Sequence, residues 1–231
     1  MSSAFNVETL GEDALLLRFG HAIDPQTNRR VHACAAALAR QRPPWLLDIV
    51  PAFSTLALAI DVEAFNDSSE PLADARRWLE SLDPGRPGAG IDEDARRHEI
   101  PLHYGGEHGP DLEALARHAG LSVAQVIALH TAVEYRVGML GFAPGFPYLI
   151  GMDERLSMPR HATPRTRVQA GSVGIAGAQT GIYPGTGPGG WQIIGRTDAI
   201  LFDATQERPA LLEPGDRVRF IDIDARRESS S

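Results

Sequence analysis

Two kinds of apolar pattern occur in the first 82 residues, one typical of strands and one typical of helices. Short apolar runs bounded by turn residues occur at 5–10, 14–19, 45–50 and 56–62, as expected for strands. Two longer segments, which begin at Asp24-Pro25 and at Pro71, carry apolar residues every three or four positions, as a helix with one buried face does. Asp24 as N-cap and Pro25 as first residue support the first helix. The pattern predicts a small α+β domain over 1–82, with helices packed on one face of an antiparallel sheet.

A segment rich in proline, glycine and acidic residues follows at 83–95 and is the predicted linker. Beyond it the pattern predicts a strand at 97–104 and two helices, at 112–119 and 123–132. Ser122 and Gln125 have the spacing of a capping box, in which each side chain bonds the backbone N–H of the other residue. The second helix is therefore the more strongly predicted of the two.

From Tyr135 to Thr197 the apolar runs are short and interrupted by Gly or Pro, which predicts short strands, tight turns and long loops. Later strands are predicted at 199–202 and 217–223, and residues 226–231 are predicted to fray. We therefore interpret residues 96–225 as a β-barrel-like domain with two helices inserted near its start.

Composition and charge exclude several kinds of protein. Apolar residues make up 43% and charged residues 23% of the 231-residue chain, as in ordinary folded domains. The net charge of −8 disfavours binding to nucleic acid or to anionic membranes. No apolar run approaches the roughly 20 residues that span a bilayer, and the N-terminus lacks the features of a signal peptide, so we expect a cytoplasmic protein. The single cysteine, Cys34, lies on the apolar face of the first helix and is expected in the core. A single cysteine excludes an intramolecular disulfide and a multi-cysteine zinc site.

All 22 basic residues are arginine. The absence of lysine excludes a Walker A P-loop, Schiff-base catalysis and the Ser-x-x-Lys hydrolases. Recognition of a phosphate or carboxylate must therefore use arginine, backbone N–H groups or a metal.

Charge is unevenly distributed along the chain. The window from Arg155 to Thr197 holds five arginines and no acid, while the rest of the chain holds 17 arginines and 30 acids. Arginine binds carboxylate or phosphate through two parallel N–H groups, and glycines let backbone N–H groups approach an oxyanion. The window therefore indicates an anion-binding site, although solvated loop arginines would give the same composition.

Two further motifs are interpreted as turns. Residues 185–190 have the G-x-G-x-x-G spacing of dinucleotide-binding proteins, but strand-forming residues follow from Trp191 instead of a helix. Ser172 lies in a sequence similar to a nucleophile elbow, which lacks the first glycine and the following helix.

His130, Glu134 and Tyr135 form a third candidate group, at the end of the capped helix. His130 and Glu134 are four residues apart and share one helix face. A histidine, a carboxylate and a phenol this close can perform acid–base chemistry, whereas a histidine at a helix end is also a common capping or packing group. His103 and His108 lack the spacing of a known ligand set, so no metal site is predicted.

The same part of the chain resembles a known family. The stretch from His130 to Leu149, HTAVEYRVGMLGFAPGFPYL, is similar to the H-x4-Y…GFxPGFxYL signature of the bacterial 5-oxoprolinase B subunits, or carboxyltransferase domain subdomains C and D, a family that includes the kinase A inhibitor KipI. The similarity continues through PRHATPRTRVQAGSV, IAGAQTGIYP and PGGW, and upstream through IPLHYGGEHGPDL, so that it covers residues 97–200. Members often carry Ser where this chain has Gly187, so a ligand contact of that hydroxyl would be lost here.

The resemblance implies a ferredoxin-like N-terminal α+β domain and a cyclophilin-like β-barrel domain, within the α+β class. It implies a subunit of an ATP-dependent 5-oxoprolinase, inactive alone, which cleaves 5-oxoproline to L-glutamate together with subunits A and C. ATP is the implied co-substrate, with Mg²⁺ as a candidate companion ion, and a chain without lysine carries no attached biotin. The alternatives are a KipI-type inhibitor of a sensor histidine kinase and a component of a biotin-dependent system like urea carboxylase or allophanate hydrolase.

The signature and the acid-free window together give the candidate site residues. We predict catalytic roles for His130 and Tyr135. We predict that the substrate or an anion is bound by Arg160, Arg165, Gln179, Tyr183, Arg196, Gly177, Gly189 and Gly190.

Overall fold

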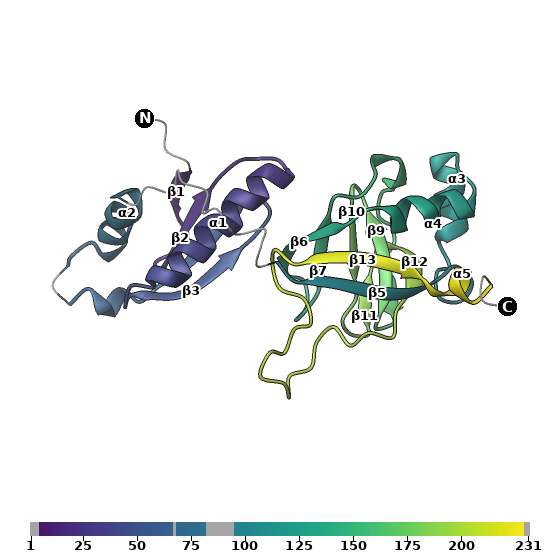
Figure 1. Cartoon of the computed structure of the whole chain (residues 1–231). Coiled ribbons are helices and arrows are strands. Elements are labelled where there is room, and N and C mark those ends of the chain that lie inside the picture. Colours follow the sequence, from purple (N-terminus) through teal and green to yellow (C-terminus); the bar gives the residue numbers. More distant parts are fainter. Residues whose placement is uncertain (1–4, 67, 82–94, 229–231) are drawn as a thin grey trace. The chain divides into compact units, whose positions relative to one another are not determined.

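The computed structural model describes residues 5–66, 68–81 and 95–228. The chain divides into two compact units, Met1–Asp94 and Ala95–Ser231 (Figure 1). The linker predicted at 83–95 lies outside the described residues except for Ala95. No helix in the described parts of the chain is both long and apolar enough to cross a membrane.

The first unit is a four-stranded antiparallel sheet with two helices packed on one of its faces. The strands are β1 (Asn6–Thr9), β2 (Ala14–Arg18), β3 (Leu46–Pro51) and β4 (Thr55–Ile60), in the order β1-β2-β4-β3. The helices are α1 (Pro25–Gln41) and α2 (Pro71–Ser81), and a short 3₁₀ helix η1 (Val62–Ala64) follows β4. Alternate strand residues such as Leu17 and Leu58 meet Val31 of α1 and Leu79 of α2 in one core.

The sequence signals of this unit have the expected structural roles. The Asp24 carboxylate accepts hydrogen bonds from the backbone N–H groups of Gln26 (3.3 Å) and Thr27 (2.7 Å), so it caps α1. Cys34 is buried in the core, as predicted, and burial raises the pKa of its thiol to about 11. The element order is ββαββα, whereas a ferredoxin-like domain has the order βαββαβ, so the unit shares the α+β class of that fold but not its order of elements.

The second unit is a closed barrel of seven strands. Around the barrel they run β10-β7-β6-β13-β5-β12-β9, and β10 pairs with β9 to close it. Their bounds are β5 (Arg97–Tyr104), β6 (Tyr135–Leu140), β7 (Pro147–Ile150), β9 (Ser172–Ala176), β10 (Gln179–Ile182), β12 (Gln192–Arg196) and β13 (Arg217–Asp222). All neighbouring pairs are antiparallel except β5 and β13. This architecture confirms the predicted α+β chain with a β-barrel domain.

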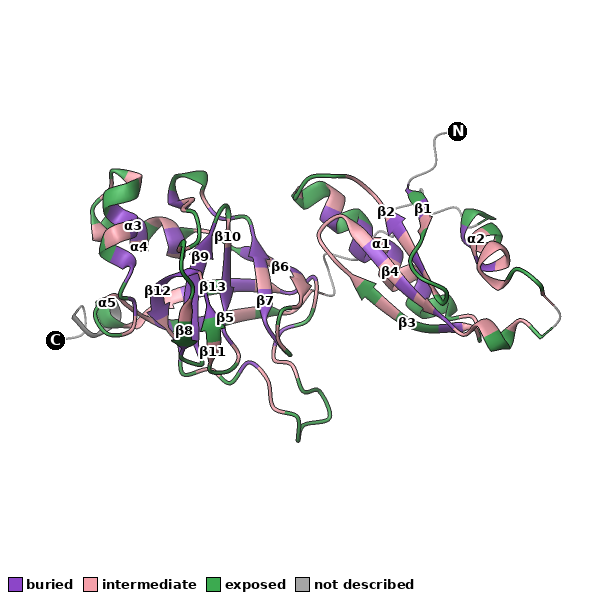
Figure 2. Ribbon diagram, turned by 180° about the vertical axis from the view of Figure 1, so that it is seen from behind, coloured by how far each residue is buried: buried purple, intermediate pink, exposed green. Residues whose placement is uncertain are grey.

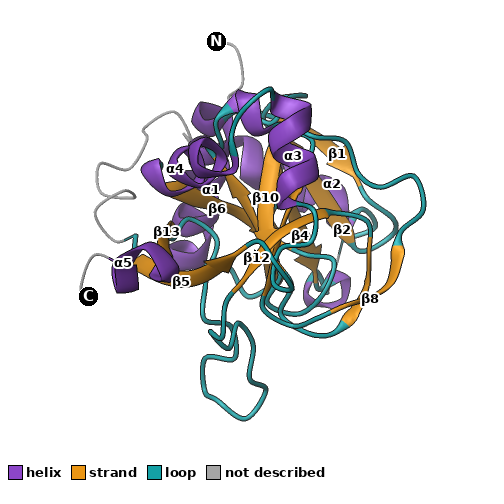
Figure 3. Ribbon diagram, turned by 90° about the vertical axis from the view of Figure 1, so that its right-hand side faces the viewer, coloured by secondary structure: helices purple, strands orange, loops and turns teal. Residues whose placement is uncertain are grey.

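The remaining elements of the second unit surround the barrel. Two helices, α3 (Leu112–Ala119) and α4 (Val123–Ala132), pack against each other beside β12 and β13 (Figure 3). The predicted capping box is present in front of α4, with Ser122 and Gln125 bonded reciprocally at 2.8 and 3.2 Å. A two-stranded ribbon of β8 (Arg165–Val168) and β11 (Gly187–Gly189), a 3₁₀ helix η2 (Glu154–Leu156) and a helix α5 (Ile223–Glu228) complete the unit.

One prediction for this unit is wrong. Residues 199–202 form no strand, because Phe202 makes only an isolated bridge to Ala210, and the neighbouring Pro209 has no N–H with which to extend a ladder. Residues 226–228 of the tail belong to α5, which starts directly where β13 ends, and the fraying of the tail stays a prediction. The other residues of the predicted tail, 229–231, lie outside the described part of the chain.

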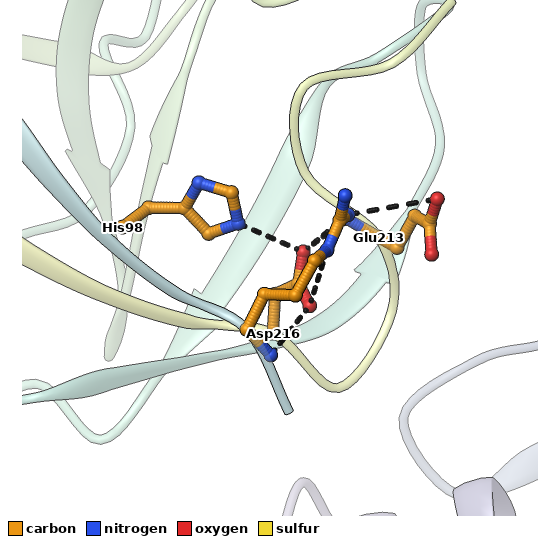
Figure 4. Close-up of polar contacts among 4 residues, drawn as sticks. His98, Glu213 and Asp216 are labelled. Carbon is orange, nitrogen blue, oxygen red and sulfur yellow. Dashed lines mark hydrogen bonds and ion pairs between the residues drawn. The ribbon is translucent and has the colours of Figure 1, made fainter. Parts of the chain in front are cut away.

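A buried carboxylate joins the parallel strands β5 and β13 where they begin (Figure 4). Asp216, which precedes β13, accepts a hydrogen bond from Nη2 of Arg96 at 2.8 Å and one from the backbone N–H of Glu213 at 2.9 Å. Nε2 of His98 lies 3.1 Å from the same carboxylate, whose side chain is 7% exposed. This cluster secures the one parallel pairing of the barrel, which no hairpin connects.

We expect the substitution Asp216→Asn to lower the free energy of unfolding by about 1–3 kcal/mol, because the donors around this buried carboxylate lose their charged acceptor. Urea denaturation followed by circular dichroism measures the change. Glu213→Gln is the matched control: Glu213 pairs with Arg96 at 3.5 Å but is half-exposed, so the loss should stay below about 1 kcal/mol. Equal losses in the two variants would contradict a special role for Asp216.

Candidate functional site

The outer wall of the barrel is built on two paired glycines in β9 and β10. Gly174 and Gly181 lie opposite each other in the antiparallel register. A Cβ atom at Gly174 would lie 2.9 Å from Cβ of Trp191, and one at Gly181 would lie 2.9 Å from Cζ of Phe146. Such distances are shorter than van der Waals contact, so any larger residue would displace the rings from the wall. Glycine at both positions lets two aromatic side chains lie directly on the backbone.

Five aromatic side chains gather on this glycine floor, and we name them the aromatic face: Phe142, Phe146, Tyr148, Tyr183 and Trp191. The Phe146 ring lies 5.2 Å from Tyr183 and 5.4 Å from Trp191, at interplanar angles of 86° and 82°. Edge-to-face pairs of this kind stabilise an aromatic cluster beyond simple burial. Phe142 lies 5.4 Å from Phe146 at the rim, and 66% of its surface is exposed. The face is therefore open to solvent on the Phe142 side.

Two of the predicted arginines border the aromatic face. The guanidinium carbon of Arg160, an exposed residue, lies 5.7 Å from the centroid of the Trp191 ring, in the range of a cation–π contact. Burial raises the pKa of the Tyr183 hydroxyl, while a backbone hydrogen bond from Trp191 and the charges of Arg160 and Arg165 act in the opposite direction. Both arginines thus lie near enough to Tyr183 to act on its hydroxyl.

Asp111 organises the segment that carries these arginines. Its carboxylate accepts hydrogen bonds from the Ile193 backbone N–H at 2.6 Å and from Nη2 of Arg165 at 2.7 Å, and it lies 3.2 Å from Nε2 of His161. Burial acts to raise the pKa of Asp111, but the bonds from Arg165, Ile193 and His161 outweigh it, and the pKa lies below its ordinary value. Asp111 precedes α3 without capping it, so its side chain serves to fix β8 and β12.

Two buried donors near the aromatic face have no acceptor among the described residues. They are Nη1 of Arg165 and Nε2 of Gln179. Gln179 lies two positions before Gly181 in β10 and therefore projects to the same outer side of the wall. Buried donors without acceptors are uncommon and suit a site at which a bound molecule supplies the oxygen atoms.

The predicted glycines serve the same wall in different ways. Gly189 pairs with Arg165, and a side chain there would collide with the Tyr183 ring. Gly190 accepts a hydrogen bond from the His161 backbone N–H at 2.8 Å. Gly177 turns the hairpin between β9 and β10 with a φ of +56°.

The five arginines of the acid-free window do not converge. Arg196 donates a hydrogen bond to Oε1 of Gln169, at the far end of β12 from Trp191. Arg155 binds Asp153 through two hydrogen bonds, of 2.9 and 2.6 Å, and Arg167 is exposed on β8. Arg160 and Arg165 therefore both lie near the Tyr183 hydroxyl, while Arg155 and Arg196 are bonded elsewhere.

His130 and Tyr135, the predicted catalytic residues, lie inside the barrel. Both residues are 0% exposed. Figure 2 shows that buried positions, in purple, run along the strands of this unit. The His130 ring stacks on Phe220 at 4.6 Å, and the Tyr135 hydroxyl donates a hydrogen bond to the His130 backbone oxygen at 3.0 Å. Burial raises the pKa of Tyr135 and lowers that of His130 to about 3. This placement favours a packing and positioning role, and the catalytic roles stay predictions.

A directed chain of hydrogen bonds connects His130 to the glycine floor. The Thr180 hydroxyl donates to the backbone oxygen of Gly174 at 3.0 Å, so its oxygen accepts from Nε2 of His130 at 3.3 Å. Nδ1 of His130 is then the acceptor for the Tyr104 hydroxyl at 2.7 Å. The neutral imidazole thereby fixes the inner side of the wall whose outer side carries the aromatic face.

The other sequence motifs have structural roles. In the G-x-G-x-x-G segment, residues 187–189 form β11 and no helix follows, as predicted. Ser172 is buried at the start of β9. No group of three or more histidine, cysteine, aspartate or glutamate side chains suited to a metal occurs in the described part of the chain.

Sequence reasoning did not single out Phe142, Trp191 or Asp111 as site residues. In the sequence, Phe142 and Trp191 were noted only as positions within the family motifs. Asp111 gave no signal, because its partners Arg165 and His161 lie 54 and 50 positions away.

We expect His130→Gln to flatten the pH dependence of stability between about pH 6 and pH 3. In this range the unfolded chain binds a proton at His130, with a pKa of about 6.5, that the folded chain does not bind. The contribution of His130 to the free energy of unfolding is therefore fully present above about pH 6.5. It falls by up to about 1.4 kcal/mol per pH unit as the solution is acidified. Denaturation series at several pH values measure the slope.

His118→Gln is the matched control for this experiment, because His118 is exposed on α3. An unchanged slope in the His130 variant would contradict the buried neutral state. A catalytic His130 would also lower turnover per folded molecule of an active complex by about 10²-fold or more, which packing alone does not predict.

Comparison with known proteins places the chain in a family. Residues 5–212 match the family model described as carboxyltransferase domain, subdomain C and D. The chain is 44% identical to the 5-oxoprolinase B subunit of Bacillus subtilis (strain 168) over 232 residues, which cover 96% of this chain and 95% of the relative. It is 42% identical to the 5-oxoprolinase B subunit of Escherichia coli O157:H7 over 214 residues, covering 92% and 93% of the two chains.

A solved structure has the same fold. The crystal structure of TTHA0988 in space group P6522 is 41% identical, with a TM-score of 0.76 over 91% of this chain. The present chain spans 40% of the length of that one. With the family model matched over most of the sequence, the chain belongs to the carboxyltransferase domain, subdomain C and D, family, in which its full-length relatives are B subunits of 5-oxoprolinase.

Proposed function

We propose that the chain is a subunit of an ATP-dependent 5-oxoprolinase and acts with subunits A and C to open 5-oxoproline to L-glutamate. The observation that carries this proposal is the similarity, over more than nine-tenths of the chain, to relatives named as B subunits of 5-oxoprolinase. The aromatic face with Arg160 and Arg165 supports it, because this face offers the groups that a small anionic substrate requires.

The chemistry of the reaction explains why cationic groups are needed. A lactam is unreactive, and transfer of the γ-phosphoryl group of ATP to the lactam oxygen, which releases ADP, would activate the ring carbon. Water would then add to that carbon, and the C–N bond would break as the nitrogen takes up a proton. A second water would release inorganic phosphate from the acyl phosphate and leave glutamate. Phosphoryl transfer is catalysed mainly by positioning and by charge stabilisation. In a chain without lysine, we expect an anion to be bound by arginines such as Arg160 and Arg165 and by backbone N–H groups of glycines such as Gly189 and Gly190.

We expect glutamate release from 5-oxoproline and ATP when this chain is combined with subunits A and C, and little or none from the chain alone. The reason is that the described residues offer an anion site but no nucleotide-binding motif. Glutamate and ADP are measured together, with and without added Mg²⁺. Robust turnover by the single chain would contradict the subunit assignment.

The same experiment separates the alternative functions. A complex that fails to turn over, together with inhibition of histidine-kinase autophosphorylation by this chain, would favour the regulatory function. A biotin-dependent activity would require biotin on another chain, since this one has no lysine to carry it.

We expect Arg160→Lys and Arg165→Lys each to lower kcat/KM of the complex by roughly 10- to 100-fold. Lysine keeps the charge but loses the planar pair of N–H groups, and a hydrogen bond to a charged group contributes about 1.5–3 kcal/mol. Arg167→Lys is the matched control, because Arg167 lies on the same ribbon as Arg165 but is not among the groups that act on the Tyr183 hydroxyl. Unchanged kcat/KM in both site variants would remove the arginines from the proposed anion site.

Arg196→Lys tests the wider anion clamp that the sequence predicts. Because Arg196 is bonded to Gln169 at the far end of β12, we expect a smaller effect there than at Arg160. A loss of kcat/KM equal to or larger than that of Arg160→Lys would show that Arg196 takes part in the anion site.

A further inference from the structure

Phe142 is held in a backbone conformation that aromatic residues rarely adopt. Its φ is +66°, in the left-handed region that favours glycine. The backbone N–H of Ala143 donates a hydrogen bond to the backbone oxygen of Gly141 at 2.7 Å, which closes a three-residue γ-turn around Phe142. A γ-turn with a positive central φ is rare and strained. Strain of this kind persists where the surrounding structure enforces it, and it concentrates at functional sites.

The surroundings of the turn enforce this conformation. The Gly141 backbone N–H bonds the oxygen of Phe146 at 3.2 Å, and the Phe146 N–H bonds the oxygen of Ala143 at 3.0 Å. Gly145, with a φ of +78°, packs so closely that an added Cβ would lie 2.8 Å from Cβ of Phe202. The fold therefore fixes an apolar ring in solvent, where it gains little from burial.

The ring is directed toward the aromatic face. Its centroid lies 6.1 Å from that of Tyr183, whose hydroxyl is acted on by the charges of Arg160 and Arg165. Arg160 has no acidic partner among the described residues, and Nη1 of Arg165 is buried there without an acceptor. The site thus offers apolar surface, positive charge and hydrogen-bond donors, but no carboxylate beyond the Asp111 that already binds Arg165.

We propose that Phe142 and Arg160 form the two sides of a binding site for a small ring-shaped amide that carries a carboxylate. The ring of the ligand packs on Phe142, its carboxylate pairs with Arg160, and its amide oxygen accepts from Arg165. The inference rests on the proposed function, in which this ligand is 5-oxoproline itself. Free phosphate shares the negative charge but offers nothing to the Phe142 ring.

The test is isothermal titration of the full chain with 5-oxoproline, 2-pyrrolidinone and inorganic phosphate. The change in tryptophan fluorescence, to which Trp191 contributes, is a second readout. We expect saturable binding of 5-oxoproline, and binding at least about tenfold weaker for 2-pyrrolidinone, which lacks the carboxylate. Absence of saturable 5-oxoproline binding, or binding of phosphate with equal affinity, would overturn the proposal.

Phe142→Gly separates binding from stability. Glycine adopts a φ of +66° without strain, so the melting temperature should stay equal or rise, while the affinity for 5-oxoproline should fall at least about tenfold with the loss of the ring. Arg160→Gln should weaken 5-oxoproline but leave 2-pyrrolidinone unchanged. Ile200→Ala, which removes another exposed apolar side chain of the same unit, is the matched control and should bind as the wild type does. Wild-type affinity in the Phe142→Gly variant would overturn the role of the ring.

The binding test is independent of the turnover test. If the complex with subunits A and C releases glutamate but this chain binds no 5-oxoproline, the inference fails and the proposed function stands. If the chain binds 5-oxoproline with the expected variant pattern but the complex releases no glutamate, the site stands and the proposed function fails.

Discussion

The absence of side chains at Gly174 and Gly181 is the constraint on which the outer face of the barrel depends. These glycines are paired across β9 and β10, and the Cβ atom of Trp191 and the ring of Phe146 occupy the space that their side chains would take. Tyr183 packs edge-on against Phe146 on this wall, and Phe142 packs against Phe146 at the rim of the aromatic face. A closed barrel leaves no sheet edge for such a site, so the site is built on a face.

The family signature is divided between the two sides of this wall. His130 and Tyr135 are buried inside, whereas Phe142, Phe146 and Tyr148 lie outside. The two sides are joined through Thr180, which accepts from His130 and donates to the backbone oxygen of Gly174. A neutral buried histidine is suited to this position, because one nitrogen donates and the other accepts. The interior thereby sets the position of the floor on which the aromatic rings rest.

Charge at the site is set by one buried acid. Asp111 engages Arg165 and lies beside His161, and it fixes their segment to β12 through the backbone N–H of Ile193. Arg160 remains exposed above Trp191. The same carboxylate therefore neutralises part of the acid-free window and leaves one arginine in position for a ligand, which a count of charges along the chain cannot distinguish.

The sequence by itself determined the local structure and the family. The strands and helices of the first unit, the caps at Asp24 and Ser122, the buried Cys34 and the glycine-broken barrel strands all follow from spacing and capping chemistry, which act within a few residues. The family followed from motifs over residues 97–200. Only the tertiary structure decided that His130 is enclosed while Phe142 is exposed, and that Arg160 and Arg165 both lie near Tyr183 while Arg196 is bonded to Gln169. The physical reason is that barrel closure places residues 50 or more positions apart in contact, as at Asp111 and His161, and no periodicity along the chain carries that information.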